Sequence, residues 1–389
     1  MNNRPEKFKL DGVELVTNPM FWNITDQVIQ LTGRDLLKEE NKLSTIKNKI
    51  INYFQENYRK TNDDQTSYPI FDFFERPRII AIETLKKTNL CTKLDLSNIV
   101  FFINDSHCLR TSTSDFNFEL LSKGYVNFIL QGAGFLKLTL NFNSELNFLV
   151  ILTEILKKKH FRLLEAGIRE GPRIQKSRTS YLLWARHLDM NANKFPCYHY
   201  ITGVRTFTAE ELFGNNVQSL FEDQPINYLR SAGKQNTHKA YTVESLRGQM
   251  HRIATNLAYF IFAGTRLGGA ELSFTVPDND NYSTHCLKIL CDGSFKEIIT
   301  FGVIDQRLLS SAGLNGRVGF FFFICLENIA NIIHNINDLR DYWSPQNSFP
   351  DNMDINNLFS DVMEYNPNLM DPILGWSNFN PSSSTNNED

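Results

Sequence analysis

Short apolar runs separated by polar residues place the strongest constraint on what this chain can fold into. The two longest runs extend from Leu146 to Leu156 and from Val318 to Leu326. A helix needs roughly 20 apolar residues to cross a bilayer, so both runs are expected in a protein core. No apolar stretch follows the polar start Met1–Lys7, which predicts that a cleavable signal peptide is absent. We therefore expect a cytoplasmic protein, or one delivered into a host cell without a cleaved signal.

The spacing of the apolar residues changes along the chain and predicts an α+β fold. Between residues 20 and 60 these residues recur at helical intervals, as at Ile46, Ile50 and Phe54. From Phe135 to Phe142 apolar and polar residues alternate, which predicts a strand with one face in water. The glycines of Gln131–Gly134 predict the turn of a hairpin before that strand.

The second half of the chain predicts short strands mixed with helices. The expected strands are Cys197–Ile201, Ala258–Phe262 and Leu287–Leu290. The expected helices are 209–214, Ser245–Ile253 and most of Val318–Asp341, which has an apolar start that could also form a strand.

Changes in composition divide the chain into four predicted regions. A helical N-terminal region, 1–66, ends in a polar break, and an α+β middle region, 67–156, follows it. An α+β domain, 157–343, is expected to hold the functional site. Residues 344–389 are rich in Pro, Asn, Ser and Asp, and they are predicted to form a flexible acidic tail, because such a segment cannot bury enough surface to fold alone.

The charge and the cysteines narrow the classes of function. A net charge of −3 argues against a protein whose whole surface binds nucleic acid. The six cysteines are irregularly spaced and form no CxxC pair, so neither a zinc site nor a disulfide framework is indicated. We expect reduced, mostly buried thiols and predict no metal site.

One basic segment, 157–178, could still contact nucleic acid. It carries clustered cations opposed by two glutamates, and such clusters bind phosphate by releasing counterions. An alternative is a solvated helix end whose cations complement the helix dipole. The residues predicted to contact nucleic acid are Lys157, Lys158, Lys159, Arg162, Arg169 and Arg173.

The strand Cys197–Ile201 carries the sharpest candidate for chemistry, a histidine between two tyrosines. His199 is followed by Thr202, by a short helix that ends at Gly214, and later by the aromatic segment Ala258–Phe262 and by Glu297. This order over residues 197–300 resembles the ADP-ribosyltransferase superfamily, in which a strand-borne histidine and threonine precede an aromatic strand and a glutamate.

The resemblance implies a mono-ADP-ribosyltransferase-like effector or toxin that transfers ADP-ribose from NAD to a macromolecular target. His199 and Glu297 would be catalytic, with Glu297 stabilising the positive charge that develops on the ribose. Thr202, Tyr259 and Phe260 would bind the NAD. Ser112–Ser114 match a serine-threonine-serine element of other branches, although they precede His199 in the chain.

Two other classes of function stay open on the sequence alone. The acidic tail is dotted with apolar pairs and is also typical of a non-catalytic module that binds other proteins. The basic segment 157–178 would instead make the chain a nucleic-acid binder.

Overall fold

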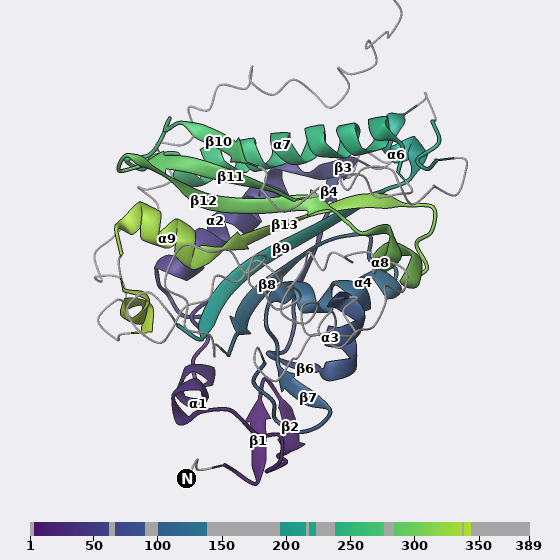
Figure 1. Cartoon of the computed structure of the whole chain (residues 1–389). Helices are drawn as coiled ribbons and strands as arrows, with labels where there is room; N and C mark the ends of the chain where they lie inside the picture. Colours follow the sequence, from purple (N-terminus) through teal and green to yellow (C-terminus); the bar gives the residue numbers. More distant parts are fainter. Residues whose placement is uncertain are drawn as a thin grey trace, which may run out of the picture. The chain divides into compact units, whose positions relative to one another are not determined.

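A seven-stranded sheet organises the described part of the chain (Figure 1). The computed structural model describes residues 4–61, 67–89, 100–137, 195–214, 218–222, 238–275, 284–336 and 338–343. The strand order is β10-β11-β12-β13-β9-β8-β5, and all neighbours are antiparallel except the pair β5 and β8. The strands are β5 (Asp72–Glu75), β8 (Asn127–Phe135), β9 (Cys197–Phe207), β10 (Leu272–Thr275), β11 (Thr284–Cys291), β12 (Ser294–Val303) and β13 (Val318–Cys325).

The remaining strands of the described residues form three small two-stranded sheets. They pair β1 (Lys7–Leu10) with β2 (Val13–Val16), β3 (Arg59–Thr61) with β4 (Ser67–Pro69), and β6 (Ile79–Ala81) with β7 (His107–Leu109).

The helices include two that begin at well-formed caps. The side chain of Asn41 accepts the backbone N–H groups of Leu43 and Ser44 at the start of α2, and Thr25 caps α1 in the same way. The helices are α1 (Asp26–Thr32), α2 (Lys42–Asn57), α3 (Ile82–Asn89), α4 (Asn117–Ser122), α6 (Ala209–Phe213), α7 (Ala240–Phe262), α8 (Gln306–Ser311), α9 (Leu326–His334) and the 3₁₀ turns η2 (Thr113–Phe116) and η3 (Leu339–Trp343).

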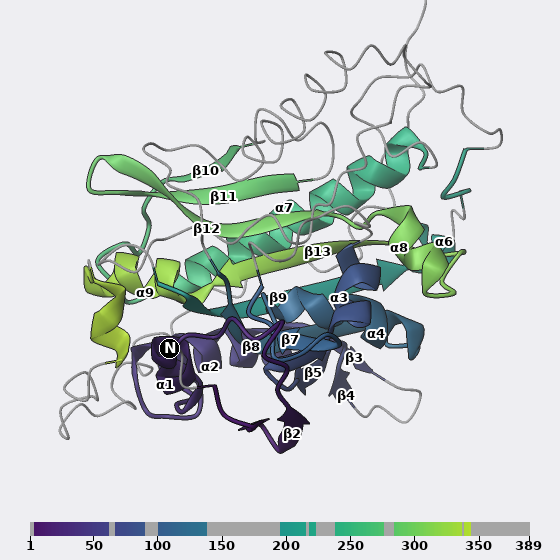
Figure 2. The ribbon, with the colours of Figure 1, turned by 60° about the horizontal axis from the view of Figure 1, so that its bottom comes forward.

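The two faces of the large sheet pack against different helices, because successive side chains of a strand point to opposite faces. On the first face, Phe320 and Phe322 of β13 pack with α7, and the ring of Phe322 stacks on Phe54 of α2 at 5.0 Å. On the second face, Phe321 joins Val204 of β9 in an apolar cluster with α3, α4 and α8. Figure 1 shows α3, α4 and α8 gathered beside β8 and β9, and Figure 2 shows α7 running along β12 and β13.

The predicted α+β class is confirmed, and so are several elements. The helices between residues 20 and 60, the strand that begins at Cys197, the short helix that ends before Gly214 and the strand around Leu287–Leu290 are all present. Strands of the predicted middle region, β5 and β8, pair in the same sheet as the five strands of the predicted C-terminal region. The predicted basic segment 157–178 and tail 344–389 lie outside the described residues.

Two predicted elements are wrong. Ala258–Phe262 forms the end of helix α7 and is not a strand. Five consecutive apolar residues resemble a buried strand, because a short apolar run carries no helical periodicity of its own. Within the helix, Ala254, Leu257, Ala258 and Ile261 are buried at helical intervals, while Tyr259 is half exposed. Gln131–Gly134 is not a turn, because both glycines lie inside strand β8.

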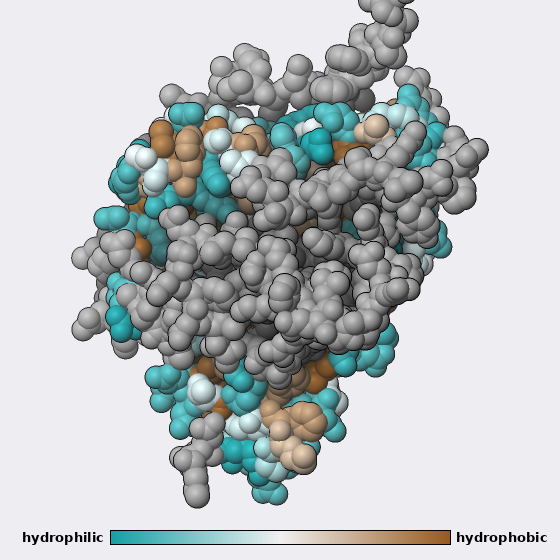
Figure 3. Space-filling model, viewed as in Figure 1, coloured by the Kyte–Doolittle hydropathy of each residue, from teal (hydrophilic) through white to brown (hydrophobic). Residues whose placement is uncertain are grey.

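The described surface mixes hydrophilic and hydrophobic residues on the side seen in Figure 3. Among the described residues, no helix combines the length and apolarity required to traverse a lipid bilayer. The five cysteines described there are free, and four of them are buried, as the sequence predicts.

Candidate functional site

A buried polar turn lies on the second face of the sheet, between strand β7 and helix α4. Its residues, Arg110–Asp115, are each at most 5% exposed. Charged and hydroxyl side chains are costly to bury without partners, so a fully buried set of them is a candidate functional site. We call Arg110–Asp115 the polar turn.

The carboxylate of Asp115 holds the polar turn together. It accepts the backbone N–H of Thr111 at 2.6 Å, the backbone N–H of Ser112 at 3.1 Å and the hydroxyl of Thr111 at 2.9 Å. Burial raises the pKa of Asp115 to about 6, although these hydrogen bonds oppose the rise. The carboxylate of Asp115 therefore stabilises the polar turn by accepting hydrogen bonds from residues of the same turn.

The guanidinium of Arg110 joins the polar turn to its surroundings. It donates from Nε to the carbonyl of Ala133 in β8 and from Nη1 to the carbonyl of Arg76 at 2.7 Å. Burial lowers the pKa of Arg110 to about 10, and the nearby Asp115 opposes that change. A Cβ at Gly132 would lie 1.9 Å from Nη2 of Arg110, which explains why a glycine stands inside this strand.

Thr202 in the middle of β9 touches the polar turn directly. The hydroxyls of Thr113 and Thr202 lie 2.6 Å apart, and both residues are fully buried. The next inward-facing residue of β9 is Tyr200, whose ring lies 4.8 Å from that of Phe323 in β13. The structure thus assembles the predicted residue Thr202 with the serine-threonine-serine segment noted in the sequence.

His199 has a carboxylate partner, but that partner is Glu327. Nδ1 of His199 lies 2.7 Å from Oε1 of Glu327, and its backbone N–H lies 3.0 Å from both carboxylate oxygens. Glu297 instead accepts a hydrogen bond from the hydroxyl of Thr300 at 2.8 Å. Glu327 was not among the residues predicted from the sequence, although a lone carboxylate directly after an apolar strand and at the start of a helix is a recognisable signal.

The two predicted aromatic residues lie on helix α7. Tyr259 is 52% exposed, and the ring of Phe260 lies 5.0 Å from that of Tyr53 in α2. Lys49 of α2 lies over the same Phe260 ring. Phe260 therefore contributes to the packing of α7 on α2.

Comparisons with known proteins point to a different family from the one that the sequence resembled. Residues 232–353 match the family model of the tRNA synthetases class II core domain (F). This segment includes helices α7 to α9 and strands β10 to β13. It covers less than half of the chain.

The similar curated proteins are phenylalanine–tRNA ligases of organelles. The mitochondrial enzyme of Rattus norvegicus is 23% identical over 340 residues, which are 84% of this chain and 58% of that protein. The probable mitochondrial enzyme of Drosophila melanogaster is 21% identical over 367 residues, 89% of this chain and 67% of that protein. The chain thus spans less than two thirds of the length of the rat relative.

Among solved structures, a pyrrolysyl-tRNA synthetase from Desulfitobacterium hafniense is similar with a TM-score of 0.42 and 10% identity. The similarity covers 77% of this chain and 72% of that one.

These findings correct the functional prediction. The matching family and relatives are aminoacyl-tRNA ligases, so the prediction of an ADP-ribosyltransferase that acts as an effector or toxin is wrong. The prediction that NAD is the substrate bound by His199, Thr202, Tyr259 and Phe260 is therefore also wrong. The physical reason is that the motif was short: a histidine and a threonine on one strand fit many sheets. The required aromatic strand is also the end of helix α7.

Proposed function

We propose that this chain is a tRNA-binding protein related to the class II aminoacyl-tRNA synthetases, and that its tRNA is one that accepts phenylalanine. The observation that carries the proposal is the extent of the similarity: phenylalanine–tRNA ligases match 84% to 89% of the chain, well beyond the segment that fits the class II family model.

The basic segment 157–178 supports the same partner from a separate direction. Eight of its side chains are lysines or arginines, and only Glu165 and Glu170 oppose them. Clustered cations release counterions from a nucleic-acid backbone and so supply binding energy without reading the sequence. We propose that this segment contacts the phosphates of the tRNA.

We propose the mitochondrion as the site of action, in place of the cytoplasm that the sequence alone predicts. The relatives in rat and Drosophila are named as mitochondrial proteins. A full-length chain with a C-terminal fluorescent tag should co-localise with a mitochondrial dye. A diffuse cytoplasmic signal would reject this part of the proposal.

Binding of a transcribed phenylalanine tRNA, measured by filter retention at several salt concentrations, tests the tRNA proposal. The variant with Lys157→Glu, Lys158→Glu and Lys159→Glu should bind at least about tenfold more weakly, with a salt dependence lowered by about two to three counterions. The matched control changes three exposed lysines elsewhere, Lys9→Glu, Lys60→Glu and Lys86→Glu. Equal losses in both variants would mean that net charge alone, and not this segment, governs binding.

The charging reaction of tRNA synthetases raises a further requirement, because it uses ATP and an amino acid, typically with Mg²⁺. Among the described residues, no group of three His, Cys, Asp or Glu side chains is placed to hold a metal ion. Two arginines beside the sheet are engaged with polar partners: Arg317 with Glu211, and Arg110 with two backbone carbonyls. Arg205 of β9 lies over the ring of Phe207. The guanidinium groups of Arg110 and Arg317 are therefore occupied within the protein and are not free to hold the phosphates of a nucleotide.

A further inference from the structure

The engaged arginines and the packing of the sheet lead to an inference that rests on the proposed function. We infer that the described sheet of this chain forms no site for ATP or an amino acid, and that the protein binds tRNA without charging it. The evidence is the way in which both faces of the sheet are filled around strands β9 and β13.

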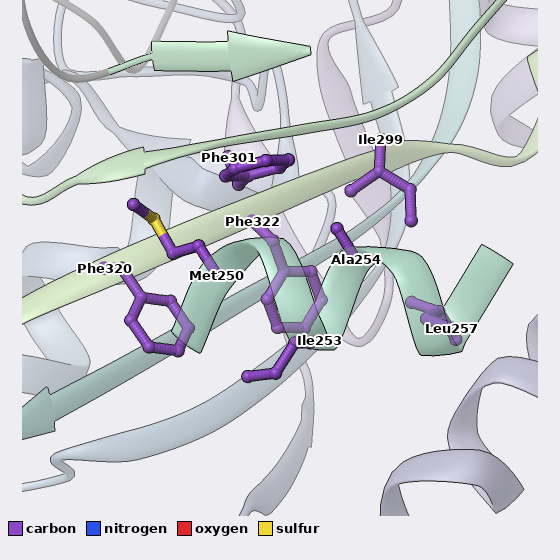
Figure 4. A pocket seen from close by; sticks show the side chains of 8 residues that line it. All are labelled: Met250, Ile253, Ala254, Leu257, Ile299, Phe301, Phe320 and Phe322. Atoms are coloured by element: carbon purple, nitrogen blue, oxygen red, sulfur yellow. The ribbon is translucent and has the colours of Figure 1, made fainter. Parts of the chain in front are cut away.

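The first face is closed by apolar side chains of α7. Met250, Ile253 and Leu257 of the helix meet Phe320 and Phe322 of β13. Figure 4 shows these side chains pointing toward one another across the gap between helix and strands. The cavity that they leave is about 10 Å³. That volume holds about one water molecule, whereas ligand pockets measure roughly 300–1,000 Å³.

The second face is closed over β8 and β9 by the polar turn. The hydroxyls of Thr113 and Thr202 are in direct contact at 2.6 Å, so no ligand atom fits between the turn and the strand at this point. A Cβ at Gly134 would lie 2.3 Å from the backbone oxygen of Thr111, so the turn also rests on the backbone of β8. Gly132 and Gly134 of β8 thus allow the polar turn to pack directly against the strand, and no opening remains between them.

Aromatic rings occupy the same face next to the polar turn. The rings of Tyr200 and Phe323 lie 4.8 Å apart, and that of Tyr198 lies 6.3 Å from Tyr200. All three residues are buried. Further along β13, Phe321 packs with Val204 in the apolar cluster beneath α3, α4 and α8. A substrate would have to displace these rings.

The charges beside the sheet give a second, independent reason. A triphosphate is held by cations, by magnesium or by free backbone N–H groups. The guanidinium of Arg110 is fully buried, with Nε and Nη1 donating to backbone carbonyls, and Arg317 pairs with Glu211 and the hydroxyl of Thr206. Neither of these two groups can turn to a phosphate without breaking hydrogen bonds inside the protein. The third arginine, Arg205 of β9, lies over the ring of Phe207 at 4.8 Å.

An equilibrium binding experiment on the full-length chain tests the inference. One preparation is divided between phenylalanine tRNA, measured by filter retention, and MgATP, measured by equilibrium dialysis and by the shift in Tm. We expect saturable tRNA binding and no retention of ATP. We also expect no change in Tm when the MgATP concentration is about a hundredfold above the Kd of an ordinary nucleotide site. In a protein with such a site, MgATP at that concentration would raise the Tm by several degrees. The rat relative in the same buffers is the positive control.

The outcomes separate this inference from the proposed function. Saturable binding of ATP with a matching rise in Tm overturns the inference, whether or not tRNA binds. Absence of tRNA binding in a preparation with a cooperative thermal transition overturns the proposed function, while absence of ATP binding in that preparation still supports the closed sheet.

Discussion

Around strands β9 and β13 the two faces of the large sheet are filled by different kinds of interaction. On the first face, apolar side chains of α7 meet the phenylalanines of β13, and the attraction has no preferred direction. On the second face, the polar turn Arg110–Asp115 rests on β8 and β9 through hydrogen bonds with defined donors and acceptors. The comparison indicates that the first face should tolerate change gradually, while the second should fail when one partner is removed.

Removal of the Arg110 guanidinium should have the largest effect and tests whether the second face depends on single hydrogen-bond partners. Arg110→Met leaves the carbonyls of Ala133 and Arg76 without their donor and leaves Asp115 without a nearby cation. We expect a loss of about 3–5 kcal/mol in the free energy of unfolding, as measured by urea denaturation. The exposed Arg340→Met is the control and should leave stability unchanged. Equal stability of the two variants would mean that the polar turn contributes little.

A methyl group on β8 tests the contact between the strand and the polar turn. Gly134→Ala places a Cβ against the backbone of Thr111, which cannot move without moving the whole turn. We expect a loss of about 2–3 kcal/mol in urea denaturation. The matched control is Gly248→Ala in α7, where no atom lies within 4 Å, and there the higher helix propensity of alanine should stabilise the protein by about 0.5–1 kcal/mol. Destabilisation of similar size in both variants would contradict the close approach.

On the first face a smaller effect is expected from a comparable truncation. Phe322→Leu removes part of the ring that stacks on Phe54 at 5.0 Å, and the flexible neighbours of α7 can partly fill the gap. We expect a loss of about 1–2 kcal/mol with the fold retained, again by urea denaturation. A loss larger than that of Arg110→Met would reverse the predicted order of the two faces.

The two faces should also respond to pH in opposite directions. On the first face, burial lowers the pKa of His285 to about 4, so the unfolded chain takes up a proton first and stability falls as the pH drops from about 6.5 to 4. On the second face, the raised pKa of Asp115, about 6, means that the unfolded chain loses its proton first, and this contribution to stability falls as the pH rises from about 4 to 6.

Replacement of His285 separates the two pH effects. His285 stacks on Phe301 and lies near His251 and Arg247, so His285→Phe keeps an aromatic ring without the titrating group. The free-energy difference between wild type and variant should move in favour of the wild type as the pH rises from 4 to 6.5 and then stay constant. Urea denaturation at several pH values measures it, and a difference independent of pH would reject the assignment.

Local patterns predicted much of the fold, and long-range contacts account for the errors. Alternation and helical spacing identify the α+β class, α2 and the strand that begins at Cys197. Five apolar residues in a row hid the helical character of Ala258–Phe262, which becomes clear only when Ala254 and Leu257 are counted with them. Gly132 and Gly134 resemble a turn because their partners, Arg110 and Thr111, are more than twenty positions away in the sequence.

The candidate site was partly visible in the sequence. Thr202, which the sequence predicts to bind a ligand, lies in the buried polar contact with Thr113 of the segment Ser112–Ser114. Their meeting could not be predicted, because it depends on the pairing of β8 with β9. The same limit applies to His199, whose partner Glu327 lies 128 positions along the chain.

Exchange of labelled pyrophosphate into ATP is the most direct test of the central claim, because it detects activation of any amino acid without requiring tRNA. With phenylalanine or any other standard amino acid, the full-length chain should give no exchange above the protein-free background, while the same preparation retains phenylalanine tRNA. Exchange that depends on protein, on Mg²⁺ and on one amino acid would contradict the claim that the described sheet is closed.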